Sequence, residues 1–182
     1  MGNNYEKNFS KKQRKILVLG IEKSGKTCFV QCVNGKELNE NNYVETNDLD
    51  IIDVKKDKFW LQFYDFAGQE RKRIFWRHHY IGAQGIVFVV DGSTMETFQD
   101  SLDALQQLLK ERNLVKVPIC IFINKSDIKV ESEVKNKVED LLKEVSIPGD
   151  NHRTVNSIQG SNKQKQGHQE VIEWLAKTMV EI

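Results

Sequence analysis

Three short runs of almost continuous apolar residues stand out along the chain. They cover residues 15–19, 86–90 and 117–123 and are rich in β-branched side chains. Such runs are too short for buried helices, and strands covered on both faces of a parallel sheet show this pattern. We therefore expect them to form the centre of a mostly parallel sheet.

Three further segments have the periodicity of amphipathic helices. Their apolar residues recur every three or four positions within residues 98–109, 134–145 and 171–179. Ser93 and Glu96 have the spacing of a capping box, so we expect this pair to open the first of these helices.

Between the first two apolar runs, residues 49–55 and 58–65 predict a β-hairpin that turns at Lys56-Asp57. Strands and helices that alternate along a chain, with one hairpin among them, indicate an α/β fold with an antiparallel edge strand. We expect one domain, residues 15–182, preceded by a basic tail of residues 1–14.

The composition narrows the class of protein. A chain of 182 residues with 39% hydrophobic and 29% charged residues is typical of one globular domain. Lys and Arg number 27 against 26 Asp and Glu, and this balance argues against a nucleic-acid binder. No apolar run is long enough to cross a bilayer. The chain has an odd number of cysteines, Cys28, Cys32 and Cys120, which argues against a disulfide framework and indicates a reducing compartment, so we expect a cytoplasmic protein. We also expect a monomer.

The segment Gly20-Ile-Glu-Lys-Ser-Gly-Lys-Thr27 fits the phosphate-loop pattern G-x-x-x-x-G-K-[ST] and directly follows the first apolar run. In such a loop, backbone N–H groups and the dipole of the following helix hold phosphates. Lys26 would reach the β- and γ-phosphates, and the Thr27 hydroxyl would ligate Mg²⁺. The other loop residues predicted to line the nucleotide site are Glu22, Lys23, Ser24, Gly25 and Cys28. This motif alone leaves an ATPase or a nucleoside kinase open.

Three more motifs follow in order: Asp65-Phe-Ala-Gly-Gln-Glu70, Asn124-Lys-Ser-Asp127 and Ser161-Asn-Lys163. They resemble the D-x-[AG]-G-Q switch II, the N-K-x-D base-reading motif and the S-A-K loop of small GTPases of the Ras superfamily. The resemblance covers essentially the whole chain. It implies a P-loop NTPase G-domain with a mostly parallel six-stranded sheet, one antiparallel edge strand and helices on both faces.

The base-reading residues have a clear chemical role. A carboxylate at Asp127 can accept hydrogen bonds from the guanine N1–H and 2-amino group, which adenine does not offer. A site built for such bonds leaves buried polar groups unpaired when the wrong base enters, so it discriminates strongly. Asn124 would contact the base and Lys125 would lie over the purine. Ser161, Asn162 and Lys163 complete the implied nucleotide site.

The switch II residues carry the implied chemistry. Asp65 would hold Mg²⁺ through water, the Gly68 N–H would bond the γ-phosphate, and Gln69 would orient the attacking water. We assign no arginine within the chain to catalysis, so we expect slow hydrolysis without an activating protein. A partner's arginine adds roughly 10³ to 10⁵ in rate in related enzymes. We expect Arg71 and Arg73 to form a basic surface that faces partners.

The subfamily follows from spacing. The D-x-A-G-Q-E pattern is similar to Ras and Rab proteins, whereas residues 76–80 and 84–91 resemble the Arf family. Thr46 lies at the short separation from Asp65 that is typical of Arf and Sar proteins. It would close on Mg²⁺ and the γ-phosphate in the GTP state. We identify a divergent Arf-like protein and keep a Rab- or Ras-like GTPase as the alternative.

The region before switch II departs from the family. Glu45 stands where Arf proteins usually have proline, and Asn47-Asp48 replaces an apolar-glycine pair. Leu49, Tyr64 and His79 occupy the positions of an aromatic trio that Arf proteins present to effectors. The resemblance implies an exchange factor, an activating protein and effectors, but it does not identify them.

The first residues raise the question of a membrane. Gly2 is an acceptor position for N-myristoylation, although Glu6 stands where serine or threonine is usual. One acyl chain gives only marginal binding, about 10⁴ M⁻¹, but with the basic residues of 7–15 it can hold a protein at an anionic membrane surface. A solvated tail without this role is the alternative.

The sequence therefore predicts a GTP-binding switch with slow hydrolysis that acts in membrane trafficking or cargo delivery. A second hypothesis is a GTP-binding interaction module that barely hydrolyses GTP. The unusual residues around Thr46 favour it, whereas Gln69 and Thr46 themselves argue against it. Asn124 and Asp127 disfavour the ATPase or nucleotide kinase.

Overall fold

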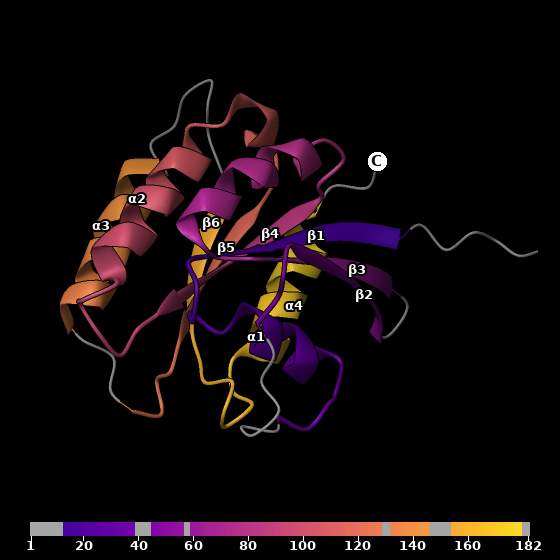
Figure 1. Ribbon diagram of the computed structural model, residues 1–182, viewed down its shortest axis with the longest axis horizontal. Helices are drawn as coiled ribbons and strands as arrows, with labels where there is room; N and C mark the ends of the chain where they lie inside the picture. Colours follow the sequence, from indigo (N-terminus) through magenta and orange to yellow (C-terminus); the bar gives the residue numbers. More distant parts are fainter. Residues whose placement is uncertain (1–12, 39–44, 57–58, 129–131, 146–153, 180–182) are drawn as a thin grey trace, which may run out of the picture.

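The computed structural model describes residues 13–38, 45–56, 59–128, 132–145 and 154–179. Within them, six strands form one sheet in the order β2-β3-β1-β4-β5-β6 (Figure 1). Only β2 and β3 pair antiparallel, as the resemblance implied. The strands are β1 (Gln13–Leu19), β2 (Leu49–Lys56), β3 (Phe59–Phe66), β4 (Gly85–Asp91), β5 (Ile119–Asn124) and β6 (Val155–Gln159).

Helices cover both faces of this sheet (Figure 1). On one face, α1 (Lys26–Val33) and α4 (His168–Thr178) pack through side chains such as Phe29 and Leu175. On the other, α2 (Phe98–Leu109) and α3 (Ser132–Val145) pack through Leu105 and Val138. The two clusters account for the continuous apolar runs, because β1, β4 and β5 are buried from both sides.

The predicted helix over residues 98–109 is confirmed as α2, but the predicted capping box is wrong. The helix begins at Phe98 after Thr97, and no side chain caps its first turn. The Ser93 hydroxyl instead donates to Asp91 Oδ1 at 2.7 Å, at the end of β4. The residues that match the capping-box spacing therefore serve the loop and not the helix.

The segment after β3 forms a 3₁₀ helix, η2 (Glu70–His79), and a shorter one, η3 (Arg112–Leu114), precedes β5. Trp76 holds η2 in place. Its ring is buried in the core cluster that lies between the sheet and α2, and its indole N–H donates to Ala67 O at 3.2 Å. Ile74 and Phe75, which directly precede it, remain more than half exposed.

The strand register determines where the motifs meet. The parallel strands all end at the same edge, and Val18 pairs with Asp65 while Asp91 pairs with Asn124. The phosphate loop after β1, Asp65 on β3 and the loops after β5 and β6 are thereby brought together.

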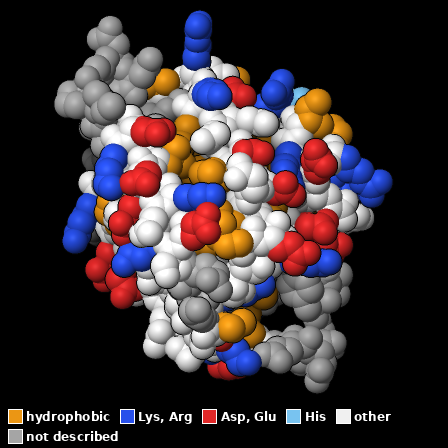
Figure 2. All heavy atoms as spheres, turned by 90° about the vertical axis from the view of Figure 1, so that its left-hand side faces the viewer, with side chains coloured by type: hydrophobic (Ala, Val, Ile, Leu, Met, Phe, Trp, Pro, Cys, Tyr) orange, Lys and Arg blue, Asp and Glu red, His pale blue; other side chains and the backbone are white. Residues whose placement is uncertain are grey.

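The outer face formed by α2 and α3 carries acidic and basic side chains interspersed with one another (Figure 2). None of the helices in the described ranges is long and apolar enough to cross a membrane.

Candidate nucleotide-binding site

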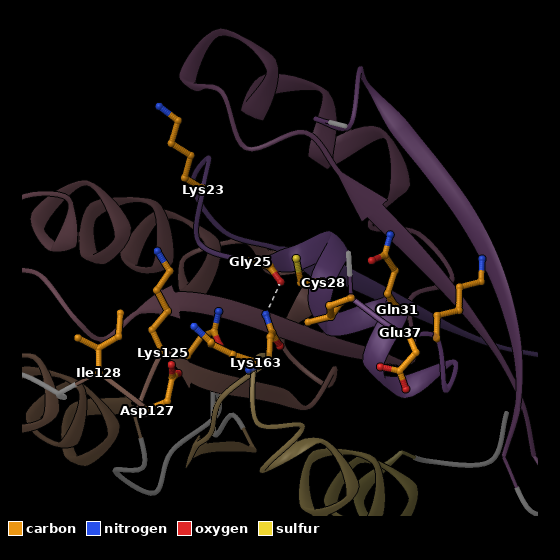
Figure 3. A pocket seen from close by; sticks show the side chains of 13 residues that line it. Lys23, Gly25, Cys28, Gln31, Glu37, Lys125, Asp127, Ile128 and Lys163 are labelled. Carbon is orange, nitrogen blue, oxygen red and sulfur yellow. Dashed lines mark hydrogen bonds between the residues drawn. The ribbon is translucent and has the colours of Figure 1, made fainter. Parts of the chain in front are cut away.

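A cavity of about 660 Å³ opens at the carboxyl edge of the sheet. Figure 3 shows that its walls come from the phosphate loop, α1 and the loops that follow β5 and β6. The residues that line it are Lys23, Gly25, Cys28, Gln31, Lys36, Glu37, Leu38, Asn124, Lys125, Asp127, Ile128, Asn162 and Lys163. Half of the residues that the sequence predicts for the nucleotide therefore share one cavity, including Asn124 and Asp127 of the base-reading motif, whereas Lys26, Thr27 and Gly68 do not line it.

Lys26 is a buried cation inside the phosphate loop. Its Nζ donates to Ile21 O at 2.7 Å, and the Ser24 hydroxyl donates to the same oxygen at 2.9 Å. Burial lowers the pKa of Lys26 to about 8, against the attraction of Asp65. A buried ammonium without a salt bridge is costly, so this position favours an anion such as phosphate.

The glycines at the ends of the loop are required by close contacts. Gly20 has φ 141°, and a Cβ there would lie 2.3 Å from Val89 O. Gly25 has φ 99°, directly before α1, and a Cβ would lie 2.4 Å from the Asn124 amide. Glu22 is exposed at the rim, where it lies 3.9 Å from Lys23.

The three residues predicted to hold a metal meet at one corner. The Oγ1 atoms of Thr27 and Thr46 lie 2.9 Å apart, and Thr46 Oγ1 donates to Asp65 Oδ2 at 3.2 Å. Asp65 Oδ1 is buried and has no hydrogen-bond partner among the described residues. Burial raises the pKa of Asp65, while the two hydroxyls and Lys26 oppose this rise. These three side chains therefore bring several oxygen atoms together at this corner, and Asp65 Oδ1 can accept a further hydrogen bond.

Gly68 lies directly against the phosphate loop. A Cβ at this position would approach Ile21 C to 2.3 Å and Glu22 N to 2.4 Å. Arg73 Nε donates to Gly68 O at 3.0 Å, and its charge contributes to the lowered pKa of Lys26. Arg73 is thus turned inward, which corrects the expectation of an outward partner surface; Arg71 is exposed as expected.

The segment around Thr46 is docked on switch II. Gln69 Nε2 donates to Glu45 Oε2 at 3.4 Å, and Arg71 Nη2 donates to Gln69 Oε1 at 3.5 Å. Lys72 Nζ donates to Asn47 O and forms a salt bridge with Asp48 at 3.1 Å. The two segments predicted to respond to the γ-phosphate therefore contact one another.

At the opposite end of the cavity, the base-reading residues are held by side-chain contacts. Asn124 Nδ2 donates to Ser24 O at 2.8 Å, which ties the base end to the phosphate loop. The Ser161 hydroxyl donates to Asp127 Oδ1 at 2.5 Å. Lys125 adopts φ 66°, and its Nζ lies 2.5 Å from Asp91 Oδ2.

Comparison with known proteins decides which family this site belongs to. A profile of the ADP-ribosylation factor (Arf) family matches residues 1–179. The chain belongs to the ADP-ribosylation factor family. It is a GTP-binding, Arf-like small GTPase; members of this family hydrolyse GTP and interact with exchange factors, activating proteins and effectors. The Ras-like, Rab-like and ATPase alternatives are thereby set aside.

Individual relatives are distant. The chain is 27% identical to ADP-ribosylation factor-like protein 3 of Chlamydomonas reinhardtii over 91% of this chain and 90% of that protein. It is 26% identical to human ADP-ribosylation factor-related protein 1 over 97% of this chain and 90% of that protein. The Arl6 (BBS3) small GTPase of Trypanosoma brucei, solved with the nucleotide analogue GppNp, has a similar fold, with a TM-score of 0.78 at 20% identity. The alignment covers 92% of this chain and 97% of that one.

The sequence missed two residues that lie at the site. His168, the first residue of α4, contacts Asn162, and Arg73 holds the backbone of Gly68. Neither belongs to a motif, so no local signal pointed to His168. Gly2 and the rest of residues 1–12 lie outside the described residues.

Proposed function

We propose that this Arf-family protein is a switch that hydrolyses GTP slowly and changes its partner surface when the γ-phosphate is lost. The observation that carries the proposal is the inward position of Thr46 and Gly68. One lies at the Thr27–Asp65 corner and the other against the phosphate loop. Loops placed in this way can respond to one additional phosphate, as in switches that order and release such segments.

Each predicted site residue then has a role. Lys26 and the phosphate loop would bind the phosphates, and Asp127 with Asn124, Lys125 and residues 161–163 would bind guanine. The Gly68 N–H would bond the γ-phosphate, and Gln69 would orient the attacking water.

The donor set at the corner fits Mg²⁺, because hydroxyl and carboxylate oxygens suit this cation and Asp65 Oδ1 is free to accept from a coordinated water. Bound there, Mg²⁺ would neutralise charge on the phosphates. Thr27 and Thr46 would be direct ligands, and Asp65 would act through water.

Hydrolysis is tested by single-turnover release of phosphate from GTP bound in advance. We expect Gln69→Leu to slow the reaction at least about tenfold, because the water loses the group that orients it. Gln106→Leu, on the exposed side of α2, is the matched control. Equal rates for the wild type and Gln69→Leu would contradict a switch timed by hydrolysis.

A second candidate, a GTP-binding module with little hydrolysis, is favoured by one contact. Glu45 stands where the family usually has proline, and its carboxylate accepts from the Gln69 amide. Gln69 held in this way is less free to orient water, so the module would keep GTP bound and act through binding alone.

The cellular role that we propose is membrane trafficking or cargo delivery, with the nucleotide controlling effector binding. It is supported by the family, whose members often associate peripherally with membranes, and by the Gly2 acceptor with the basic residues of 7–15. Sedimentation with anionic liposomes, after co-expression with an N-myristoyltransferase, tests it. Binding only with a GTP analogue would support nucleotide-controlled recruitment, and equal binding with GDP would contradict it.

A further inference from the structure

The loop between β6 and α4 is tied to the phosphate loop by one side chain. Asn162 Nδ2 donates to Gly25 O at 2.8 Å, across 137 positions of sequence. Figure 3 marks a hydrogen bond at Gly25. Asn162 is only 6% exposed and Gly25 is half-buried, so this contact is partly screened from water and is stronger than a fully exposed hydrogen bond.

The orientation of this amide is fixed by its partners. The Gly25 carbonyl can only accept, so the Asn162 amino group must face it and Oδ1 must face His168. Oδ1 lies 2.9 Å from His168 Nε2, which must therefore carry the hydrogen and donate it. His168 is 6% exposed, and its ring centroid lies 5.2 Å from those of Phe29 and Phe122, which are themselves 5.0 Å apart. The three rings therefore form one packed cluster that holds the imidazole.

Asn162 also supports the base-reading motif through its backbone. The Asn162 backbone N–H donates to Asn124 Oδ1 at 3.0 Å, while Asn124 Nδ2 donates to Ser24 O. Asn124 and Asn162 therefore form two parallel bridges from the base end of the cavity to consecutive residues of the phosphate loop. The alanine of the S-A-K loop, at the position of Asn162, has no side-chain group for the second bridge.

We propose that Asn162, oriented by His168, is a positioning residue that clamps the base-reading loop to the phosphate loop and slows release of guanine nucleotide. This inference rests on the nucleotide site proposed above. A nucleotide bound to both loops can leave only when they separate. Separation would break the Asn162–Gly25 bond and take the acceptor from the buried Asn162 amino group, whereas Gly25 O would keep its hydrogen bond from the Phe29 N–H. His168 acts through Asn162.

The test measures release of a fluorescent GDP analogue from the full chain after addition of excess GDP. We expect Asn162→Ala to release it about tenfold faster, which corresponds to about 1.4 kcal/mol for one partly buried hydrogen bond. His168→Phe keeps a ring packed against Phe29 and Phe122 but removes the donor, so release should be faster by a similar factor. His168→Gln keeps an N–H donor and should restore slow release. Gln164→Ala, exposed in the same loop, is the control.

A second measurement separates positioning from general loss of stability. His168 acts only through Asn162, so the double variant Asn162→Ala with His168→Phe should release the analogue no faster than Asn162→Ala alone. Release from Asn162→Ala within about twofold of the wild type would overturn the clamp, as would additive effects of the two substitutions, which would indicate two separate losses of stability. A wild-type protein that binds no GDP analogue would overturn the nucleotide site itself, and the clamp with it.

Discussion

Lys26 should destabilise the fold when no phosphate is bound, and Lys26→Met should remove this cost. The ammonium is 6% exposed and forms no salt bridge with the described residues. Its pKa is lowered from 10.5 to about 8, mainly because burial disfavours the charged form. A tenfold change in a proton-binding constant corresponds to about 1.4 kcal/mol, so charging Lys26 in the folded protein costs about 3 kcal/mol of folding free energy.

Stability should rise with pH, because the pKa of Lys26 is lower in the folded state than in the unfolded state. Below pH 8 both the folded and the unfolded states carry the proton, so the full cost is present. Between pH 8 and 10.5 the unfolded state binds more protons than the folded state, and stability rises with pH. The wild type should therefore gain stability across this range relative to Lys26→Met. Binding of phosphate favours the charged form, so affinity for nucleotide should weaken as the pH rises above about 8.

The assay is urea unfolding of nucleotide-free protein at about pH 7 and about pH 10. At the lower pH we expect Lys26→Met to be more stable by about 3 kcal/mol, with the difference much smaller at the higher pH. Ile21 O keeps its hydrogen bond from Ser24 in this variant, so no buried acceptor is left unpaired. Lys23→Met, whose side chain is 81% exposed, is the control and should change little. A variant that is less stable than the wild type at the lower pH would refute the reasoning.

Two further variants test the switch segments. Gly68→Ala places a Cβ against the backbone of Ile21 and must displace switch II. The hydrogen bond from the Gly68 N–H to the charged γ-phosphate would be lost, so the affinity for GTP should fall about 10- to 100-fold in equilibrium titrations. The affinity for GDP, which has no γ-phosphate, should change little. Equal losses for both nucleotides would contradict this. Glu45→Ala frees the Gln69 amide and should raise single-turnover hydrolysis about fivefold, the worth of one exposed hydrogen bond. Glu70→Ala is its control, and an unchanged rate would remove Glu45 from the mechanism.

Several features are determined by short stretches of sequence. Each central strand is visible as a continuous apolar run, because a strand buried on both faces has no polar side. The phosphate loop and the 124–127 motif are recognisable because each is one short loop whose spacing is set by the ligand chemistry. With their order along the chain, they are enough to predict the sheet and the family.

The tertiary structure decided the features that depend on distant partners. Ser93 and Glu96 fit a capping box locally, but Ser93 has a better acceptor in Asp91 at the end of a strand. Arg73 looks like a surface residue in the sequence because its partner, the carbonyl of Gly68, depends on how η2 folds back.

The clamp is the clearest case. Asn162 meets Gly25 across 137 positions and is oriented by His168 from the next helix. The sequence determines which residues are present to bind a phosphate, a metal or a base. Only packing of the loops at the carboxyl edge determines which of the remaining polar side chains are buried there, and a buried polar group must find a partner wherever the fold provides one.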